Sequence, residues 1–291
     1  MTISKLGRPR IQLRQAIVTV TRAAAVVAAL IGALLFIADR TGLIERYFIY
    51  FPRKKLEADP SRYGLAFENI SFFAADGKEL HGWFVPGRSD VTWLWFHGNA
   101  GNIGDRVENL RLLHDELGVN VFLFDYRGYG RSQGRPTEKG TYLDADAALA
   151  YLRSRSDVSH ERIVYYGRSL GAAVAVDLAT RHPPYGLILE SPFPSIRYMA
   201  RQAYPFLPIW PLIRARYDSL TKLAKVEAPI LILHGDKDDL VPIDAGRKLF
   251  DAAREPKNFY TVEGAGHNDG YIVGGQPYFT ALRAFDDRLA R

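Results

Sequence analysis

The chain has 291 residues, of which 47% are hydrophobic and 24% charged, and it contains no cysteine. This is an ordinary globular composition, and the lack of cysteine excludes disulfide bonds, a thiol nucleophile and cysteine-ligated metal sites. The net charge is +6, but residues 1–22 carry five basic residues and no acid, while the rest of the chain carries 33 basic and 32 acidic residues. A balanced body of this kind argues against a nucleic-acid-binding protein.

Residues 16–38 form an apolar stretch with a single charge, Arg22. As a helix, this stretch would span about 34 Å, enough to cross a bilayer core of about 30 Å. We expect an uncleaved membrane anchor, since no pair of small residues closes the apolar run where a signal peptidase would cut. A cleaved signal peptide and a buried soluble helix remain the alternatives. Residues 1–15 are then a basic arm, and residues 39–66 a juxtamembrane linker.

The basic arm favours a cytoplasmic N-terminus, which places the body on the periplasmic or extracellular side of the membrane. Further basic residues, from Arg40 to Lys55, follow the apolar stretch and dilute this signal. The segment Glu45–Leu56 mixes aromatic rings with cations. It fits either an interfacial collar between anchor and domain or an ordinary surface segment.

From residue 67 onward, short apolar runs alternate with helical patterns. Strands are expected at Glu68–Ala74, Glu79–Val85, Val91–Phe96, Val119–Phe124, Arg162–Tyr166, Tyr185–Leu189, Pro229–Leu233 and Lys257–Val262. Helices are expected at Asn102–Glu116, Gly140–Arg155, Leu170–Arg181, Asp244–Ala253 and Pro277–Leu289. The first two strands form a hairpin around Asp76-Gly77. This alternation predicts an α/β fold with a mostly parallel central sheet covered by helices on both faces, and chemistry at the carboxyl ends of the strands.

The pentapeptide Gly167-Arg168-Ser169-Leu170-Gly171 lies between a predicted buried strand and a predicted helix. A G-x-S-x-G sequence in this strand–turn–helix context is typical of a serine nucleophile on a tight, strained turn. The glycines are needed because side chains there would clash with neighbouring chain. The sequence therefore predicts Ser169 as a nucleophile at a helix N-terminus, whose dipole favours a developing anion.

A serine hydroxyl needs a base, and seven histidines are available. They are His81, His97, His114, His160, His182, His234 and His267. We predict His267 as the base, because it lies in a glycine-rich loop directly after the last strand. His97 and His234 also follow strands, but each precedes a glycine and is better explained as shaping a turn.

The base in turn needs an acid that holds its tautomer. Three aspartates follow the strand Pro229–Leu233, namely Asp236, Asp238 and Asp239, and we predict that Asp238 is the acid. Glu190, at the end of an earlier strand, is the less favoured alternative. The order serine, aspartate, histidine along the chain is the one expected for an α/β sheet of this kind.

A glycine-rich loop follows the predicted strand Val91–Phe96 and can supply an oxyanion hole. We assign the two donors to the backbone N–H groups of Asn99 and Leu170. A phosphate-binding loop is the rival interpretation, but the lysine and hydroxyl of that motif are absent.

Five motifs carry a family resemblance: HGNAGN at 97–102, DYRGYGRSQG at 125–134, GRSLG at 167–171, HGDKDDLVP at 234–242 and GAGHND at 264–269. Together they resemble the bud-emergence-protein-like branch of the α/β-hydrolases. The resemblance covers residues 67–291 and implies the α/β-hydrolase fold with a Ser169–Asp238–His267 triad. Relatives act as lysophospholipases, acylglycerol lipases or protein depalmitoylases, and an N-terminal anchor is common among them.

The lid of this fold corresponds to about residues 191–228, a segment rich in aromatics and prolines. Five apolar residues in it could line an acyl pocket or face the membrane, or the lid could simply pack on the body. They are Tyr204, Phe206, Leu207, Ile209 and Trp210.

The sequence thus predicts a single-pass, membrane-anchored serine hydrolase of carboxylic esters or thioesters. Its substrates would be small-molecule or lipid-like acyl compounds such as lysophospholipids, acylglycerols or acylated protein. Apart from the bilayer, we expect no cofactor, metal, nucleic acid or obligatory protein partner. The alternatives are a serine peptidase or amidase of the same fold, and a non-catalytic membrane-anchored binding protein.

Overall fold

The computed structural model describes residues 17–27, 29, 32, 45, 48–206 and 213–290. The chain divides into two compact units, Met1–Ile44 and Glu45–Arg291. In the first unit, residues 17–27 are helical with exposed side chains, and most of the other residues of the predicted anchor lie outside the described residues. None of the helices in the described ranges has the length and apolar character needed to cross a bilayer, so the structure does not support the predicted transmembrane helix.

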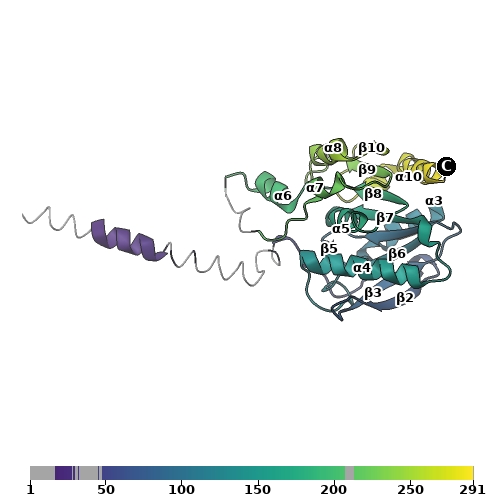
Figure 1. Ribbon diagram of the computed structural model, residues 1–291, viewed down its shortest axis with the longest axis horizontal. Helices are drawn as coiled ribbons and strands as arrows, with labels where there is room; N and C mark the ends of the chain where they lie inside the picture. The colour runs from purple at the N-terminus through teal and green to yellow at the C-terminus, as the bar shows by residue number, and fades with distance from the viewer. Residues whose placement is uncertain are drawn as a thin grey trace, which may run out of the picture. The chain divides into compact units, whose positions relative to one another are not determined.

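The second unit is built on an eight-stranded sheet (Figure 1). The strands lie in the order β10-β9-β8-β7-β4-β6-β3-β2. Their bounds are β2 Glu68–Phe73, β3 Glu79–Val85, β4 Thr92–Phe96, β6 Asn120–Asp125, β7 Ile163–Arg168, β8 Gly186–Glu190, β9 Ile230–Gly235 and β10 Lys257–Val262. The pairs β2–β3 and β3–β6 are antiparallel, and all the others are parallel. The predicted hairpin and mostly parallel sheet are therefore confirmed.

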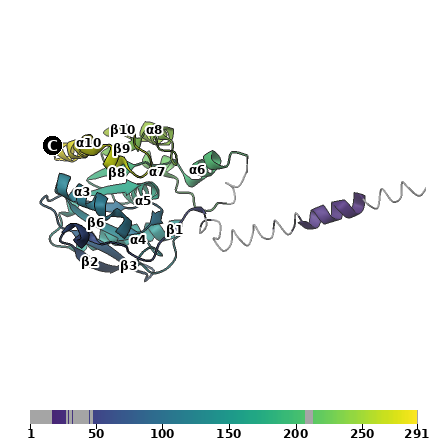
Figure 2. The ribbon, with the colours of Figure 1, turned by 180° about the vertical axis from the view of Figure 1, so that it is seen from behind.

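Helices cover both faces of this sheet. The α-helices of this unit whose bounds lie within the described residues are α3 Val107–Leu117, α4 Glu138–Ser154, α5 Leu170–Ala179, α6 Ile196–Ala203, α7 Ser219–Leu223, α8 Ile243–Ala252, α9 Gly270–Val273 and α10 Gly275–Leu289, of which α6 belongs to the lid region. In Figure 1, α4 and α5 cross the face turned to the viewer, and Figure 2 shows the molecule from behind. On the opposite face, Trp93 and Trp95 of β4 share a buried cluster with Leu110 of α3 and Phe279 of α10. Alternation along β4 thus supplies both layers of the core.

Two helix starts differ from the predicted ones because of capping side chains. The Thr137 hydroxyl accepts a hydrogen bond from the N–H of Gly140, so α4 begins at Glu138. Asn102 and Asp105 form a reciprocal capping box, and the residues after Asn102 form a short 3-10 helix, Ile103–Arg106, before α3 begins. Each cap satisfies N–H groups that lack a partner within the helix.

Most of the predicted linker is part of the domain. The compact unit starts at Glu45, and strand β1, Phe51–Pro52, pairs in parallel with strand β5, Ala100–Gly101. The N–H of Phe51 donates to the carbonyl of Asn99 at 3.0 Å, and the N–H of Arg53 donates to the carbonyl of Gly101 at 3.0 Å. A two-residue strand containing proline has no alternating pattern, so the sequence offers no signal for it.

Candidate active site

Ser169 lies in the sharp turn between β7 and α5. Its backbone has φ 52° and ψ −118°, a conformation that non-glycine residues rarely adopt. A Cβ added to Gly171 would lie 1.9 Å from the carbonyl oxygen of Phe96, and one added to Gly167 would lie 2.6 Å from the Cα of Ala172. Only glycine fits at these two positions, which explains why a glycine stands two residues before and two residues after the serine.

The structure brings Ser169, His267 and Asp238 into one hydrogen-bonded chain. The Ser169 Oγ lies 3.0 Å from Nε2 of His267, and Nδ1 of His267 lies 2.8 Å from Oδ2 of Asp238. Asp238 is fully buried at its side chain, and the His267 side chain is 10% exposed. An Nδ1–H that donates to the carboxylate leaves Nε2 as an acceptor for the serine hydroxyl, which is the arrangement that activates a nucleophile.

Asp238 is held as an anion. Its Oδ1 accepts backbone N–H groups from Leu240 at 3.0 Å and Val241 at 2.7 Å. Burial by itself would raise the pKa of Asp238, but contacts from His234, His267 and the Val241 N–H outweigh it and hold the pKa well below its ordinary value. The carboxylate therefore faces His267 with its charge intact at neutral pH.

Of the other predicted acids, Asp236 and Glu190 accept hydrogen bonds elsewhere and Asp239 is exposed. Asp236 accepts the N–H of Gly264 at 2.6 Å. The carboxylate of Glu190 accepts hydrogen bonds from the hydroxyls of Tyr166 and, at 3.1 Å, Tyr278. Asp238 is the one of these four carboxylates that lies against the His267 ring.

His97 and His234 serve the turns that they occupy. The Nδ1–H of His97 donates to the carbonyl of Gly98 at 2.7 Å, and the Nε2–H of His234 donates to the carbonyl of Val241 at 2.8 Å. Burial and the nearby Arg106 cation lower the pKa of His97 to about 3, so this ring is neutral.

A buried arginine next to the serine is the main feature of the site that the sequence did not indicate. Arg168 is 4% exposed, and its Nη2 donates to the carbonyl oxygen of His267 at 2.7 Å. Its Nε lies 3.9 Å from Oε1 of Glu190, whose own carbonyl accepts the N–H of Ser169 at 2.9 Å. The sequence signal for this pair was a basic residue at the variable position before the serine in G-x-S-x-G, together with a glutamate at the end of the next strand.

The loop after β4 passes directly over the serine. A Cβ added to Gly98 would lie 3.7 Å from the Cβ of Ser169, and Asn99 comes next in the chain. Leu170 is the first residue of α5, so its N–H has no partner within the helix. No oxygen of the described residues accepts a hydrogen bond from the N–H of Asn99. Both backbone N–H groups are thus available next to Ser169.

The lid region has two described arms. The outgoing arm includes α6, after which Tyr204 and Phe206 are exposed, Phe206 to 95%. Residues 207–212, which include Leu207, Ile209 and Trp210, lie outside the described residues.

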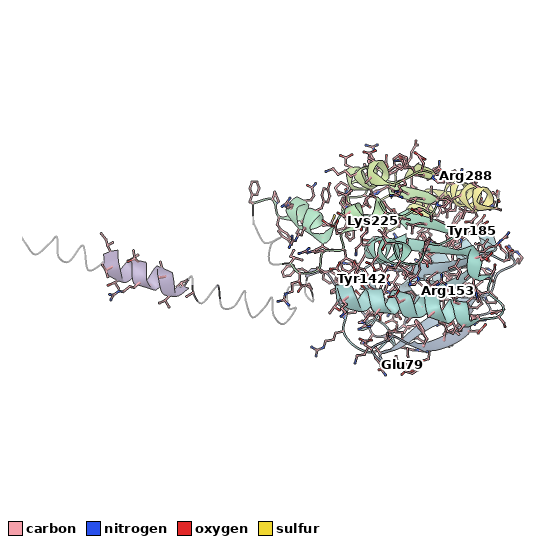
Figure 3. The ribbon with its side chains drawn as sticks, in the orientation of Figure 1. Glu79, Tyr142, Arg153, Tyr185, Lys225 and Arg288 are labelled. Carbon is pink, nitrogen blue, oxygen red and sulfur yellow. The ribbon has the colours of Figure 1, made fainter. Side chains whose placement is uncertain are left out.

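The returning arm of the lid is fixed to α4. The Glu138 carboxylate accepts the backbone N–H groups of Arg216 at 2.6 Å and Tyr217 at 2.8 Å. It also accepts the hydroxyl of Tyr142, which is labelled in Figure 3. The foot of the lid is therefore tied to the body even though its tip is exposed.

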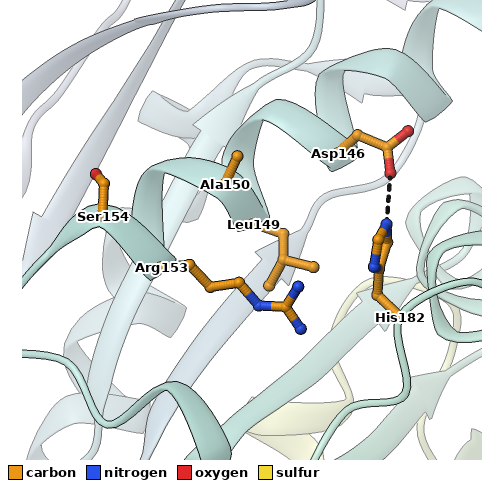
Figure 4. Close-up of a pocket in the computed structure, with 6 residues that line it drawn as sticks. All are labelled: Asp146, Leu149, Ala150, Arg153, Ser154 and His182. Atoms are coloured by element: carbon orange, nitrogen blue, oxygen red, sulfur yellow. Dashed lines mark ion pairs between the residues drawn. The ribbon is translucent and has the colours of Figure 1, made fainter.

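A surface pocket elsewhere in the domain is separate from this site. Figure 4 shows its lining residues, which come from α4 and the turn after α5 and include an ion pair of 3.5 Å between Asp146 and His182. None of the residues of the Ser169–His267–Asp238 chain lines it, so we give it no part in the chemistry.

Comparisons with known proteins show sequence similarity over most of the chain. Residues 89–216 match the family described as serine aminopeptidase, S33. The chain is 42% identical over 257 residues to the uncharacterized protein Rv2307c of Mycobacterium tuberculosis, covering 87% of this chain and 90% of that protein. It is 34% identical over 281 residues to the alpha/beta hydrolase domain-containing protein WAV2 of Arabidopsis thaliana, covering 89% and 91%.

Solved structures show the same fold. The esterase Pf2001 of Pyrococcus furiosus superimposes with a TM-score of 0.70 at 20% sequence identity, over 84% of this chain and 98% of the esterase. A likeness at this low identity concerns the fold, whereas the relative in Arabidopsis is similar along nearly its whole length. The chain therefore belongs to the α/β-hydrolase family.

Proposed function

We propose that the protein is a serine hydrolase that cleaves carboxylic esters or thioesters through a covalent acyl-enzyme. Ser169 is the nucleophile, His267 the general base and acid, and Asp238 the residue that orients His267. The observation that carries the proposal is the unbroken hydrogen-bonded chain from Asp238 Oδ2 through the His267 ring to Ser169 Oγ.

In the first half of the reaction, Ser169 Oγ attacks the acyl carbon while Nε2 of His267 takes the hydroxyl proton. The Asp238 carboxylate stabilises the imidazolium that forms. The tetrahedral intermediate then collapses, the bond to the leaving oxygen or sulfur breaks, and His267 returns the proton to that atom. In the second half, water attacks the acyl-enzyme by the same proton transfers and releases the acid, so the steps need no metal or cofactor.

The backbone N–H groups of Asn99 and Leu170 form the proposed oxyanion hole. Leu170 is at the N-terminus of α5, where the helix dipole favours negative charge, and the Asn99 loop lies above Ser169. Each such donor contributes about 3 kcal/mol to transition-state stabilisation in well-studied hydrolases.

Lipid-like acyl compounds are the substrates that the chain as a whole favours. Residues 16–38 are proposed as a single-pass anchor on the strength of their apolar sequence, with the catalytic unit on the non-cytoplasmic side. Phe48 in the aromatic and cationic segment, and Phe206 in the lid, are exposed rings of the kind that enter a bilayer interface. A catalytic unit held beside a membrane meets substrates that partition there.

The test is labelling and hydrolysis with the full-length protein. Wild type is expected to react with a fluorophosphonate probe and to hydrolyse p-nitrophenyl esters of graded acyl length, whereas Ser169→Ala is expected to do neither. Failure of folded wild-type protein to be labelled would contradict the enzyme proposal. Labelling of Ser169→Ala at the wild-type rate would show that another residue is the nucleophile.

Amide hydrolysis is the second candidate, because the matched family carries the description of a serine aminopeptidase. An aminopeptidase must hold a free amine, and the buried carboxylate of Glu190 is already engaged by Tyr166, Tyr278 and Arg168. We therefore place esters first. A comparison of kcat/KM on aminoacyl naphthylamides with that on acyl esters distinguishes the two, and faster amide turnover would reverse the order.

A further inference from the structure

Glu45 and residues 48–55, which we call the strap, lie against the loop that carries Asn99. The N–H of Phe51 donates to the carbonyl of Asn99 at 3.0 Å, and the side-chain Nδ2 of Asn99 donates to the carbonyl of Ile49 at 2.8 Å. Asn99 is thus bound to the strap through its main chain and its side chain at once.

The strap is joined to the rest of the same loop. Nδ2 of Asn102 donates to the carbonyls of Arg53 at 3.0 Å and Lys55 at 2.7 Å. The N–H of Arg53 donates to the carbonyl of Gly101 at 3.0 Å, while the Arg53 carbonyl also accepts the N–H of Gly130. The strap therefore follows the loop from residue 99 to residue 102 in a fixed register.

These contacts determine where the N–H of Asn99 lies. The strap binds both the carbonyl and the side chain of Asn99, and the Tyr129 hydroxyl donates a second hydrogen bond, of 2.8 Å, to the same carbonyl. The direction of the N–H follows from the preceding peptide, whose carbonyl, that of Gly98, accepts the Nδ1–H of His97 at 2.7 Å. In a planar trans peptide the C=O and N–H point in opposite directions, so holding the Gly98 carbonyl aims the Asn99 N–H away from His97.

The other side of the strap contacts the foot of the lid. Oε1 of Glu45 accepts the N–H of Arg214 at 2.9 Å. The hydroxyls of Tyr50 and Tyr217 lie 2.9 Å apart, and the Tyr217 hydroxyl also lies 2.9 Å from Oγ1 of Thr141 on α4. Tyr50 is 2% exposed and Tyr217 1% exposed, so this is a buried link rather than a surface contact.

We propose that the strap is a positioning element of the active site, which holds the Asn99 N–H for the oxyanion and links it to the returning arm of the lid. This inference rests on the proposed function. An oxyanion donor works only when it is pre-aligned with the oxygen that becomes charged. The strap supplies that alignment from chain that lies outside the predicted catalytic motifs.

The decisive variants are Phe51→Pro and Phe51→Ala. Both remove a half-exposed ring, but only proline also removes the N–H that donates to Asn99. We expect Phe51→Pro to lower kcat on a p-nitrophenyl ester by about 10-fold to 100-fold, where kcat is calculated from the concentration of active sites found by titration. KM is expected to change less than about 3-fold. Phe51→Ala is expected to stay within about 2-fold of wild type. Equal kcat values for the two variants would overturn the proposal.

A second variant covers the case in which Phe51→Pro fails to fold. Asn99→Ala keeps the proposed oxyanion N–H but removes the side-chain bond to Ile49, and it is expected to lower kcat by about 10-fold. An unchanged kcat in Asn99→Ala would contradict the strap even if Phe51→Pro were lost.

Hydrogen exchange of peptides covering residues 97–102 separates this proposal from the proposed function. Phe51→Pro, or Asn99→Ala if the proline variant is lost, should exchange faster there than Phe51→Ala, whatever the protein hydrolyses. One outcome is faster exchange in the variant, with Ser169→Ala as active as wild type. That outcome would refute the hydrolase mechanism but leave the strap as the segment that holds this loop. Unchanged exchange, with esterase activity that depends on Ser169, would refute the strap alone.

Discussion

Replacement of Asp238 by asparagine tests the proposed mechanism most directly, since the local hydrogen bonds determine how the new side chain must lie. Oδ1 of Asp238 accepts two backbone N–H groups, from Leu240 and Val241, while Oδ2 faces Nδ1 of His267. In Asp238→Asn the amide oxygen must take the Oδ1 position, because an NH₂ group cannot accept from two N–H donors. The NH₂ group then points at His267 and donates to Nδ1.

A donor at that position forces the wrong tautomer on His267. Nδ1 becomes the acceptor, Nε2 carries the proton, and the ring can no longer take the proton of Ser169 3.0 Å away. The same change in a well-studied serine protease lowers kcat by about 10⁴-fold, which corresponds to about 5.4 kcal/mol of transition-state stabilisation. We expect a loss of this order here, with KM changed little because the Asp238 side chain is fully buried against His267.

The assay is steady-state hydrolysis of a p-nitrophenyl ester at pH 7 by purified, folded protein. Asp239→Asn is the matched control, since Asp239 is the exposed neighbour and lies in the same loop. It should retain wild-type kcat. If Asp238→Asn kept kcat within about 3-fold of wild type, the tautomer argument would be refuted and the acid would have to be sought elsewhere.

Two further predictions concern buried ionisable side chains around the site. Arg168→Lys shortens the side chain that donates to the His267 carbonyl, so kcat should fall about 10-fold or more with KM little changed. Asn268→Ala removes a contact of 3.3 Å to the same arginine and should stay near wild type. Equal kcat values for these two variants, measured on the same ester, would contradict a positioning role for Arg168. Burial raises the pKa of Asp125 to about 8, so the folded state keeps a proton that the unfolded chain loses near pH 4. The contribution of Asp125 to the free energy of unfolding is therefore fully present below about pH 4. It declines towards pH 8 by at most about 1.4 kcal/mol per pH unit. Asp125→Asn should flatten that part of the pH profile in urea unfolding, and an unchanged slope would contradict the raised pKa.

The fold and the serine turn were predictable because each has a local cause. Buried parallel strands appear as short apolar runs, and G-x-S-x-G between such a run and a helix is nearly determined by the close approach of Gly171 to the Phe96 carbonyl. Asp238 could be separated from Asp236 and Asp239 only by its place in the motif. The structure supplies the physical difference, because Asp238 alone is buried against His267 while Asp239 is exposed.

The strap and the arginine could not be predicted because their partners are distant in sequence and mostly backbone. The bond from Phe51 to Asn99 joins two main-chain groups, and no residue type is specific for such a bond. Arg168 reaches a carbonyl 99 residues away, which no spacing along the chain reveals. A basic residue in the serine motif followed by an acid at the next strand end is a weak pattern on its own.

The positions of the reacting groups depend on contacts from neighbouring chain that themselves take no part in the chemistry. The Ser169 N–H is held by the Glu190 carbonyl, and the His267 carbonyl by Arg168. The Asn99 carbonyl is held by the Tyr129 hydroxyl and by the N–H of Phe51, which is next to Tyr50, the buried tyrosine that meets the lid. Because each contact acts on one reacting group, variants that remove a single contact should lower kcat while the fold and KM persist. If instead such variants lost stability and kept kcat per folded molecule, these contacts would serve the fold and the proposed alignment of the site would be wrong.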